Sequence, residues 1–144
     1  MAGMSRRSSR PARRPARTAT PPSSRACPCG SGGTYAQCCG RFHRGEAAAP
    51  TAEALMRSRY SAFAERDEAY LLRTWHPRTR PPRVEFEPGL RWTGLEILAT
   101  SGGTAFHTTG TVTFRAGHAG GELREHSRFE RVGGAWVYVD GDVG

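Results

Sequence analysis

The chain has 144 residues, with 21 basic and 13 acidic side chains and a formal net charge of +8. This length supports one domain with a modest core and is too short for two ordinary domains. The paired arginines at positions 6 and 7 precede no apolar export segment, and no run approaches the ~20 apolar residues of a membrane span. We therefore expect a soluble cytoplasmic protein, in which structural disulfides are disfavoured.

The positive charge is concentrated at the N-terminus. Residues 1–26 contain seven arginines, four prolines and no acidic residue, whereas the remaining 14 arginines nearly balance the 13 acidic side chains. Such a composition has few apolar groups to bury, so residues 1–26 are predicted to form a disordered basic tail. A basic arm of this kind would suit contact with RNA or the ribosome through phosphate groups.

Two helices are predicted before the middle of the chain. Thr51 is a suitable N-cap for the first helix, and apolar residues recur along it at helical spacing. A second, shorter helix is expected to begin at Asp67 and to end before Pro77, because the residue preceding a proline is pushed out of the helical region.

After a proline-rich link, the apolar period changes from helical to alternating. Strands are predicted over residues 90–100, 104–116, 122–132 and 135–140, with a β-bulge at Gly94 and with Phe106, Val112 and Phe114 directed inward. Short glycine-rich turns between them make the sheet antiparallel. The predicted fold class is α+β, with the helices covering one face of the sheet.

All four cysteines lie within thirteen consecutive positions, as Cys27, Cys29, Cys38 and Cys39. A redox dithiol normally uses a C-x-x-C spacing, which neither pair has, and a disulfide would need an oxidising compartment. Four thiolates can complete a tetrahedral structural zinc site with no open position for catalysis. We therefore interpret residues 27–45 as a zinc knuckle, and His43 is not needed as a ligand.

The stretch CPCGSGGTYAQCCG resembles the SEC-C motif, the zinc knuckle at the C-terminal end of the SecA translocase ATPase. SecA-type motifs usually end Cys-His, whereas this one ends Cys-Cys. The runs GRFHRGEAAAPTAEALMRSRYSAFAERDEAYLLRTWHPRTRP and HSRFERVGGAWVYVDG resemble the YchJ-type SEC-C proteins. That resemblance implies an N-terminal knuckle followed, over residues 46–144, by a nuclear-transport-factor-2-like (cystatin-like) α+β cone, with helices packed on a curved antiparallel sheet.

Two charged residues fall on faces that should be apolar. Arg59 lies in the apolar stripe of the first helix, and Glu125 alternates in phase with Leu123 and Phe129. We expect these two charges to pair across the helix–sheet interface, because either charge alone would be costly to bury. In cone folds of this type, the same region often encloses a pocket. Its expected lining is Arg59, Tyr60, Trp75, His76 and Glu125.

This pocket has two interpretations: a ligand or catalytic site, or a structural ion pair with Trp75 as packing and His76 at a helix end. We favour the structural interpretation. The sequence shows no nucleophile–base pair, catalytic metal set or phosphate loop, so a catalytic role is not expected. By resemblance, the knuckle of SecA contacts the chaperone SecB and the ribosome. The favoured hypothesis is therefore a non-catalytic interaction protein whose knuckle contacts a protein or ribosomal partner. The alternative is a small-molecule binder or enzyme that uses the pocket.

Overall fold

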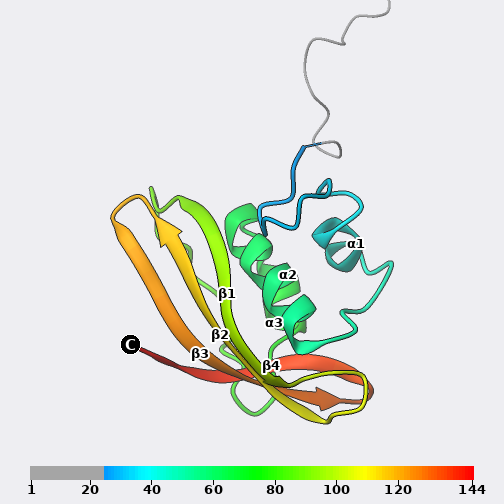
Figure 1. Cartoon of the computed structure of the whole chain (residues 1–144). Coiled ribbons are helices and arrows are strands. Elements are labelled where there is room, and N and C mark those ends of the chain that lie inside the picture. The colour runs from blue at the N-terminus through cyan, green and yellow to red at the C-terminus, as the bar shows by residue number, and fades with distance from the viewer. Residues whose placement is uncertain (1–24) are drawn as a thin grey trace, which may run out of the picture.

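A computed structural model describes residues 25–144; the predicted disorder of residues 1–24 lies outside this range. Three helices are followed by four strands, which confirms the predicted α+β class (Figure 1). In chain order, the elements are α1 (Cys39–His43), α2 (Ala52–Glu65), α3 (Glu68–Arg73), β1 (Trp92–Gly102), β2 (Thr109–His118), β3 (Gly121–Val132) and β4 (Ala135–Val143).

The strands form one antiparallel sheet in the order β1-β2-β3-β4. The sheet is curved, with α2 and α3 on its concave side and the knuckle beyond α2 (Figure 1). The register of β1 shifts between Trp92 and Gly94, where a bulge is predicted, and again between Ile97 and Ala99. Each extra residue bends the strand and increases its twist, which helps the sheet to wrap around α2.

Helices α2 and α3 both begin next to a side chain that caps the helix N-terminus. The Thr51 hydroxyl accepts a hydrogen bond from the backbone N–H of Ala54 at 3.0 Å, and the Asp67 carboxylate accepts one from Tyr70 at 3.1 Å. These bonds satisfy amide groups that a helix start leaves without partners. Between them, Arg66 takes a left-handed conformation, with φ 59°, that ends α2 and redirects the chain into α3.

The main core lies between α2 and the concave face of the sheet. Leu55, Met56 and Tyr60 from α2 pack with sheet residues such as Val112 and Phe129. Three of the four cysteines belong to the same buried cluster, so the knuckle and the sheet share one core. A second cluster joins α1, α2 and α3 through Phe42, Ala62, Tyr70 and Leu71.

The prediction that Phe106 points into the core is wrong. β1 continues to Gly102 and β2 begins only at Thr109, so Phe106 lies in the connecting loop, where it is 96% exposed. The Arg131 side chain holds this loop by donating hydrogen bonds to the carbonyl oxygens of Thr104 and His107 at 2.9 and 3.0 Å. These long-range bonds from Arg131 take the place of the strand pairing that the sequence pattern predicts for residues 104–108.

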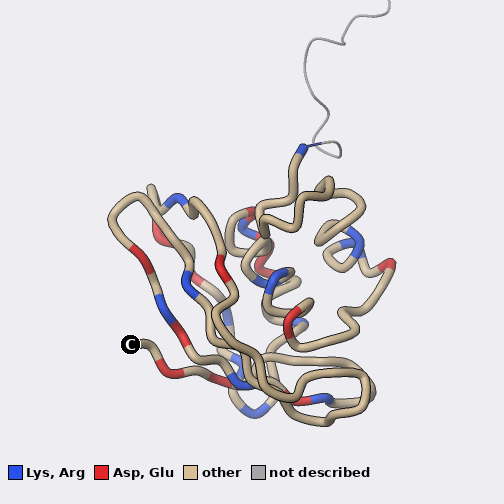
Figure 2. Tube along the Cα trace, in the orientation of Figure 1, with Lys and Arg blue, Asp and Glu red and all other residues tan. Residues whose placement is uncertain are grey.

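Charges of both signs are interleaved along the strands and around the helices (Figure 2). Arg128 on β3 pairs with Asp140 and Asp142 on β4, and Arg115 on β2 pairs with Glu96 on β1. Within residues 25–144, no helix combines the length and the apolar character that crossing a bilayer requires.

Candidate functional site

The four cysteine sulfurs lie together at the N-terminal end of the described chain. All four Sγ atoms are within 4.8 Å of one another, with 3.6 Å between Cys29 and Cys38 and 4.0 Å between Cys38 and Cys39. A disulfide would require about 2.05 Å. Tetrahedral zinc with Zn–S bonds of about 2.3 Å places its sulfurs roughly 3.8 Å apart. The cluster therefore has the dimensions of a four-thiolate metal site.

Tight backbone turns bring the sulfurs together. The N–H of Cys27 donates to the carbonyl of Gly33 at 3.0 Å, and the N–H of Gly30 returns to the carbonyl of Cys27 at 3.1 Å. Gly30 and Gly32 have φ values of 78° and 93°, which side chains with a Cβ rarely adopt. The CGSGG segment thus folds into a short loop that leads the chain back toward Cys38 and Cys39.

Helix α2 forms the floor of the cysteine cluster. Cys27, Cys29 and Cys39 are buried, and Cys38 is half-buried. The Ser61 hydroxyl on α2 lies 3.6 Å from the sulfur of Cys27, and the Arg57 guanidinium donates to the carbonyl of Cys29 at 3.0 Å. The knuckle is therefore docked on the helix by its sulfur-bearing side.

The sulfurs influence one another's ionisation. Hydrogen bonding to Cys29 and Cys39 lowers the pKa of the Cys27 thiol, and the bond to Cys27 raises the pKa values of Cys29 and Cys39. Without a cation, the cluster therefore favours ionisation of the Cys27 thiol and disfavours ionisation of the Cys29 and Cys39 thiols. A bound divalent cation would remove this difference, because it stabilises the thiolate form of each coordinating cysteine.

Arg25 and Ala26, just before the first cysteine, make specific contacts in the structure. Sequence analysis assigned Arg25 and Ala26 to the basic tail. In the structure, Arg25 pairs with Glu65 on α2 at 2.6 Å and covers the ring of Tyr35, while Ala26 forms a β-bridge with Thr34. Arg25 therefore contacts both α2 and the knuckle, and Ala26 pairs with a residue inside the knuckle.

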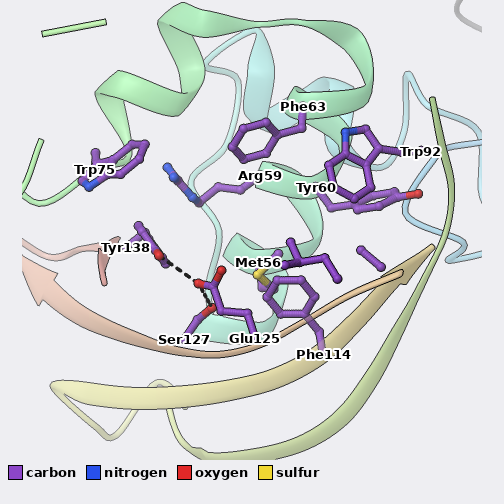
Figure 3. Close-up of a pocket in the computed structure, with 12 residues that line it drawn as sticks. Met56, Arg59, Tyr60, Phe63, Trp75, Trp92, Phe114, Glu125, Ser127 and Tyr138 are labelled. Carbon is purple, nitrogen blue, oxygen red and sulfur yellow. Dashed lines mark hydrogen bonds between the residues drawn. The ribbon is translucent and has the colours of Figure 1, made fainter. Parts of the chain in front are cut away.

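A second candidate site is a cavity of about 270 Å³ between the helices and the concave face of the sheet (Figure 3). Four predicted pocket residues line it, but His76 does not. His76 is held at β4 by a backbone bond to Tyr138, and its Nε2 lies 3.2 Å from Glu130. The cavity is lined by Met56, Arg59, Tyr60, Phe63, Trp75, Trp92, Phe114, Ala116, Leu123, Glu125, Ser127 and Tyr138.

Arg59 provides a buried positive charge at one end of this cavity. Its Nη1 donates to the carbonyl of Leu71 and to the hydroxyl of Thr74, both at 2.8 Å. Its guanidinium carbon lies 4.8 Å from the ring centre of Trp75 and 4.7 Å from that of Tyr138. Burial lowers the pKa of Arg59 to about 10, so the guanidinium remains charged at neutral pH.

Glu125 lies on the opposite wall, on β3. Its Oε2 accepts hydrogen bonds from the hydroxyls of Ser127 and Tyr138, each at 2.8 Å. A side chain at Gly141 on β4 would bring its Cβ into collision with this carboxylate, so the glycine makes room for it.

The expected direct ion pair between Arg59 and Glu125 is wrong: the two groups face the same cavity but are not within salt-bridge distance. The backbone of α3 and Thr74 hold Arg59, and Tyr138 connects the two charges by its ring and its hydroxyl.

Residues 51–141 match the family described as YchJ, middle NTF2-like domain, and residues 26–41 match the SEC-C motif. A UPF0225 protein of Streptomyces coelicolor is 70% identical over 123 residues, which cover 85% of this chain and 96% of that protein. The chain belongs to the UPF0225 family. A UPF0225 protein of Deinococcus radiodurans is 46% identical over 83% of this chain and 90% of its own length.

Two solved structures resemble this UPF0225 protein. The solution structure of a SEC-C motif containing protein from Rhodopseudomonas palustris has a TM-score of 0.68 and 33% identity, over 82% of this chain and 98% of that one. The crystal structure of a SEC-C motif containing protein from Psychrobacter arcticus has a TM-score of 0.69 and 26% identity, over 85% of each chain. The overall fold of this UPF0225 protein therefore recurs in two SEC-C motif containing proteins.

His43 is a buried residue to which sequence analysis gave no role. Its Nε2 lies 2.9 Å from the Ser58 carbonyl on α2, and its Nδ1 lies 2.6 Å from the Tyr35 hydroxyl of the knuckle. A carbonyl only accepts hydrogen bonds, so Nε2 carries a proton and donates it to Ser58. His43 thereby fastens the UPF0225 knuckle to α2. The only feature of the sequence that could have indicated this role is the position of His43, two residues beyond the SEC-C match.

Proposed function

We propose that this protein is a zinc-binding, non-catalytic interaction protein whose knuckle contacts a protein or ribosomal partner. The observation that carries the proposal is the set of four sulfurs at separations expected around tetrahedral zinc. Four thiolates favour zinc over the harder cations, which take oxygen ligands. Free thiolates persist in a reducing compartment, which supports a cytoplasmic location.

Cys27, Cys29, Cys38 and Cys39 would hold the metal, and hydroxyl groups beside them would support the charged sulfurs. Ser31 lies 3.2 Å from the sulfur of Cys38, and Ser61 is the neighbour of Cys27. Zinc in a four-thiolate site supplies cross-linking rather than reactivity, because no coordination position remains for a substrate. The role of the metal is therefore to fix the shape of the knuckle.

The outward surface of the knuckle is the proposed contact surface. The sulfur-bearing side is docked on α2, whereas the loop 30–33, Gln37 and Arg41 are exposed. Arg41 adds an exposed positive charge to the same knuckle, and the sequence of residues 1–24 contains six further arginines. Such a surface is suited to an acidic protein segment or to ribosomal RNA.

Metal analysis tests the first half of the proposal. Protein purified without added metal should contain one zinc per chain, and the double variant Cys38→Ser, Cys39→Ser should contain none. Absence of zinc from the unaltered protein, together with cysteines oxidised to disulfides, would contradict the assignment.

Cross-linking and affinity capture from cells test the second half. Arg41→Glu should keep its zinc and lose a captured partner, because it reverses an exposed charge of the knuckle and changes no cysteine, although it also removes the guanidinium from the Phe42 ring. Arg91→Glu is the matched control, since Arg91 is also exposed but lies just before β1. Equal capture by both variants would place the contact surface elsewhere.

A further inference from the structure

The guanidinium of Arg59 has hydrogen-bonding capacity that the protein does not use. The side chain is only 3% exposed, yet its hydrogen bonds within residues 25–144 all leave from Nη1. The Nε and Nη2 groups form the side of a guanidinium that presents two parallel donors. Within residues 25–144, the one fully buried side-chain polar atom without a hydrogen-bond partner is Trp75 Nε1, so Nε and Nη2 of Arg59 keep some access to solvent. This side of Arg59 can therefore meet an acceptor that enters the cavity.

Glu125 supplies the complementary group. Its Oε2 receives two hydrogen bonds, from Ser127 and Tyr138, whereas Oε1 receives none within the described residues. Figure 3 shows the second oxygen pointing away from Ser127, toward the helix wall that carries Arg59. The cavity thus offers two donors on one wall and an acceptor on the other, with a gap too wide for direct pairing.

The rest of the cavity is apolar and largely aromatic. Tyr60, Phe63, Trp92 and Phe114 surround the end opposite the charged pair, with Met56 between them (Figure 3). The cavity is partly open to solvent, and its volume of about 270 Å³ is close to the lower limit for ligand pockets. These walls suit one small, flat apolar body, which would stack on or against aromatic rings.

We propose that this cavity binds a small neutral aromatic molecule with an amide-like polar edge, in which a hydrogen-bond acceptor lies beside a donor. The acceptor would meet the free side of Arg59, and the donor would meet Oε1 of Glu125. A neutral head group is favoured because the two protein charges already balance. A carboxylate would lie against Glu125, and an ammonium group would lie against Arg59. This inference is independent of the function proposed for the knuckle.

Benzamide is the probe that tests this proposal, with benzoate and benzylammonium as its anionic and cationic counterparts. The three tryptophan indole N–H signals in a ¹⁵N–¹H spectrum of the full chain report binding. Trp75 and Trp92 line the cavity, whereas the Trp136 indole is bonded to the Pro50 carbonyl outside it. Benzamide should shift the first two signals and leave the third, with a dissociation constant of about 1 mM, as is usual for so small a ligand.

The order of affinities among the three probes tests whether the ligand is neutral, anionic or cationic. Benzamide should bind at least about fivefold more tightly than either charged probe. Glu125→Gln should reverse the order in favour of benzoate, because it removes the negative charge and leaves Arg59 uncompensated. Glu122→Gln makes the same change at an exposed position on β3 and should keep the original order.

Three results would overturn the proposal. The first is the absence of any shift at Trp75 and Trp92 with all three probes. The second is tighter binding of benzoate or benzylammonium than of benzamide to the unaltered protein. The third is a Glu125→Gln variant that remains folded, as shown by an unchanged Trp136 signal, and yet keeps the preference for benzamide.

Discussion

The cysteine cluster and the cavity both place polar groups inside the molecule, but they are built differently. The four cysteines come from one stretch of thirteen residues, and the turns between them bring the sulfurs together. The polar end of the cavity is assembled from α2, from the chain after α3, and from β3 and β4. The first site depends on local chain geometry, whereas the second depends on how separate elements pack.

This difference determines which groups compensate the buried charge. In the cysteine cluster, several thiolates together would need an external cation, because each sulfur has other thiols and at most a serine hydroxyl beside it. In the cavity, Arg59 is compensated by carbonyl and hydroxyl oxygens and by two aromatic faces, and Glu125 is compensated by two hydroxyls. The cysteine cluster takes all its ligands from one short segment and would depend on a metal to balance their charge. The cavity takes its charged groups from separate elements, which supply the balancing partners themselves.

Metal removal should have the largest effect. Structural zinc in zinc-finger peptides contributes about 10–16 kcal/mol, and loss of even part of such a contribution should lower the free energy of unfolding by several kcal/mol. Treatment with a strong chelator should therefore lower the melting temperature markedly, as measured by circular dichroism. The indole signal of Trp75, at the polar end of the cavity, should stay in place below the new transition.

A chelator saturated with zinc beforehand is the control, and it should leave the melting temperature unchanged. If the metal-free protein melts at the original temperature, the knuckle does not need its cation. If metal removal shifts or abolishes the Trp75 signal below the transition, the structure of the cavity depends on the metal site.

Arg59→Met should have the next largest effect. The substitution removes two hydrogen bonds and a guanidinium held between two rings, and it leaves the Leu71 carbonyl without its charged donor. The expected loss is about 3 kcal/mol in the free energy of unfolding, measured with urea. Arg124→Met, at an exposed position on β3, should change stability by less than about 0.5 kcal/mol.

A double-mutant cycle between Arg59→Met and Glu125→Gln sharpens the comparison. Because the two groups do not touch, their coupling energy should stay below about 1 kcal/mol. A coupling of 2 kcal/mol or more would indicate a direct ion pair between Arg59 and Glu125 in solution. The two side chains would then close the gap between the cavity walls and leave no site for a ligand there.

His43→Phe should have a smaller effect. The ring shape is retained, but the hydrogen bonds to the Ser58 carbonyl and the Tyr35 hydroxyl are lost. We expect a loss of about 1–2 kcal/mol, measured by urea unfolding of the zinc-loaded protein. His126→Phe is the control, because His126 is exposed on β3 and should tolerate the change. Equal stabilities of the two variants would show that His43 does not fasten the knuckle to α2.

Phe106→Ser should have the smallest effect, below about 0.5 kcal/mol, because the ring is almost fully exposed. Phe114→Ser, within β2 and buried in the cavity wall, should cost more than about 3 kcal/mol. Thermal unfolding of both variants measures the contrast. A large loss at Phe106 would mean that its loop packs against the domain in solution.

The sequence by itself determined the features that depend on neighbouring residues. Thr51 and Asp67 mark helix starts because a cap bonds an amide only three residues away. Gly94 marks a bulge in β1 because the alternation of apolar residues changes phase there. The four cysteines predict a cluster because the chain between Cys29 and Cys38 is short and rich in glycine.

Only the tertiary structure decided the features that depend on competition between remote partners. The pattern placed Arg59 and Glu125 on facing surfaces, but α3 and Thr74 supplied nearer oxygen atoms for Arg59, so no ion pair forms. Arg131, more than twenty residues along the chain, holds the loop that turns Phe106 outward. His43 is buried because α2 lies beside the knuckle. Alternation and helical spacing state which face a side chain occupies, whereas the packed elements determine which of several partners it reaches.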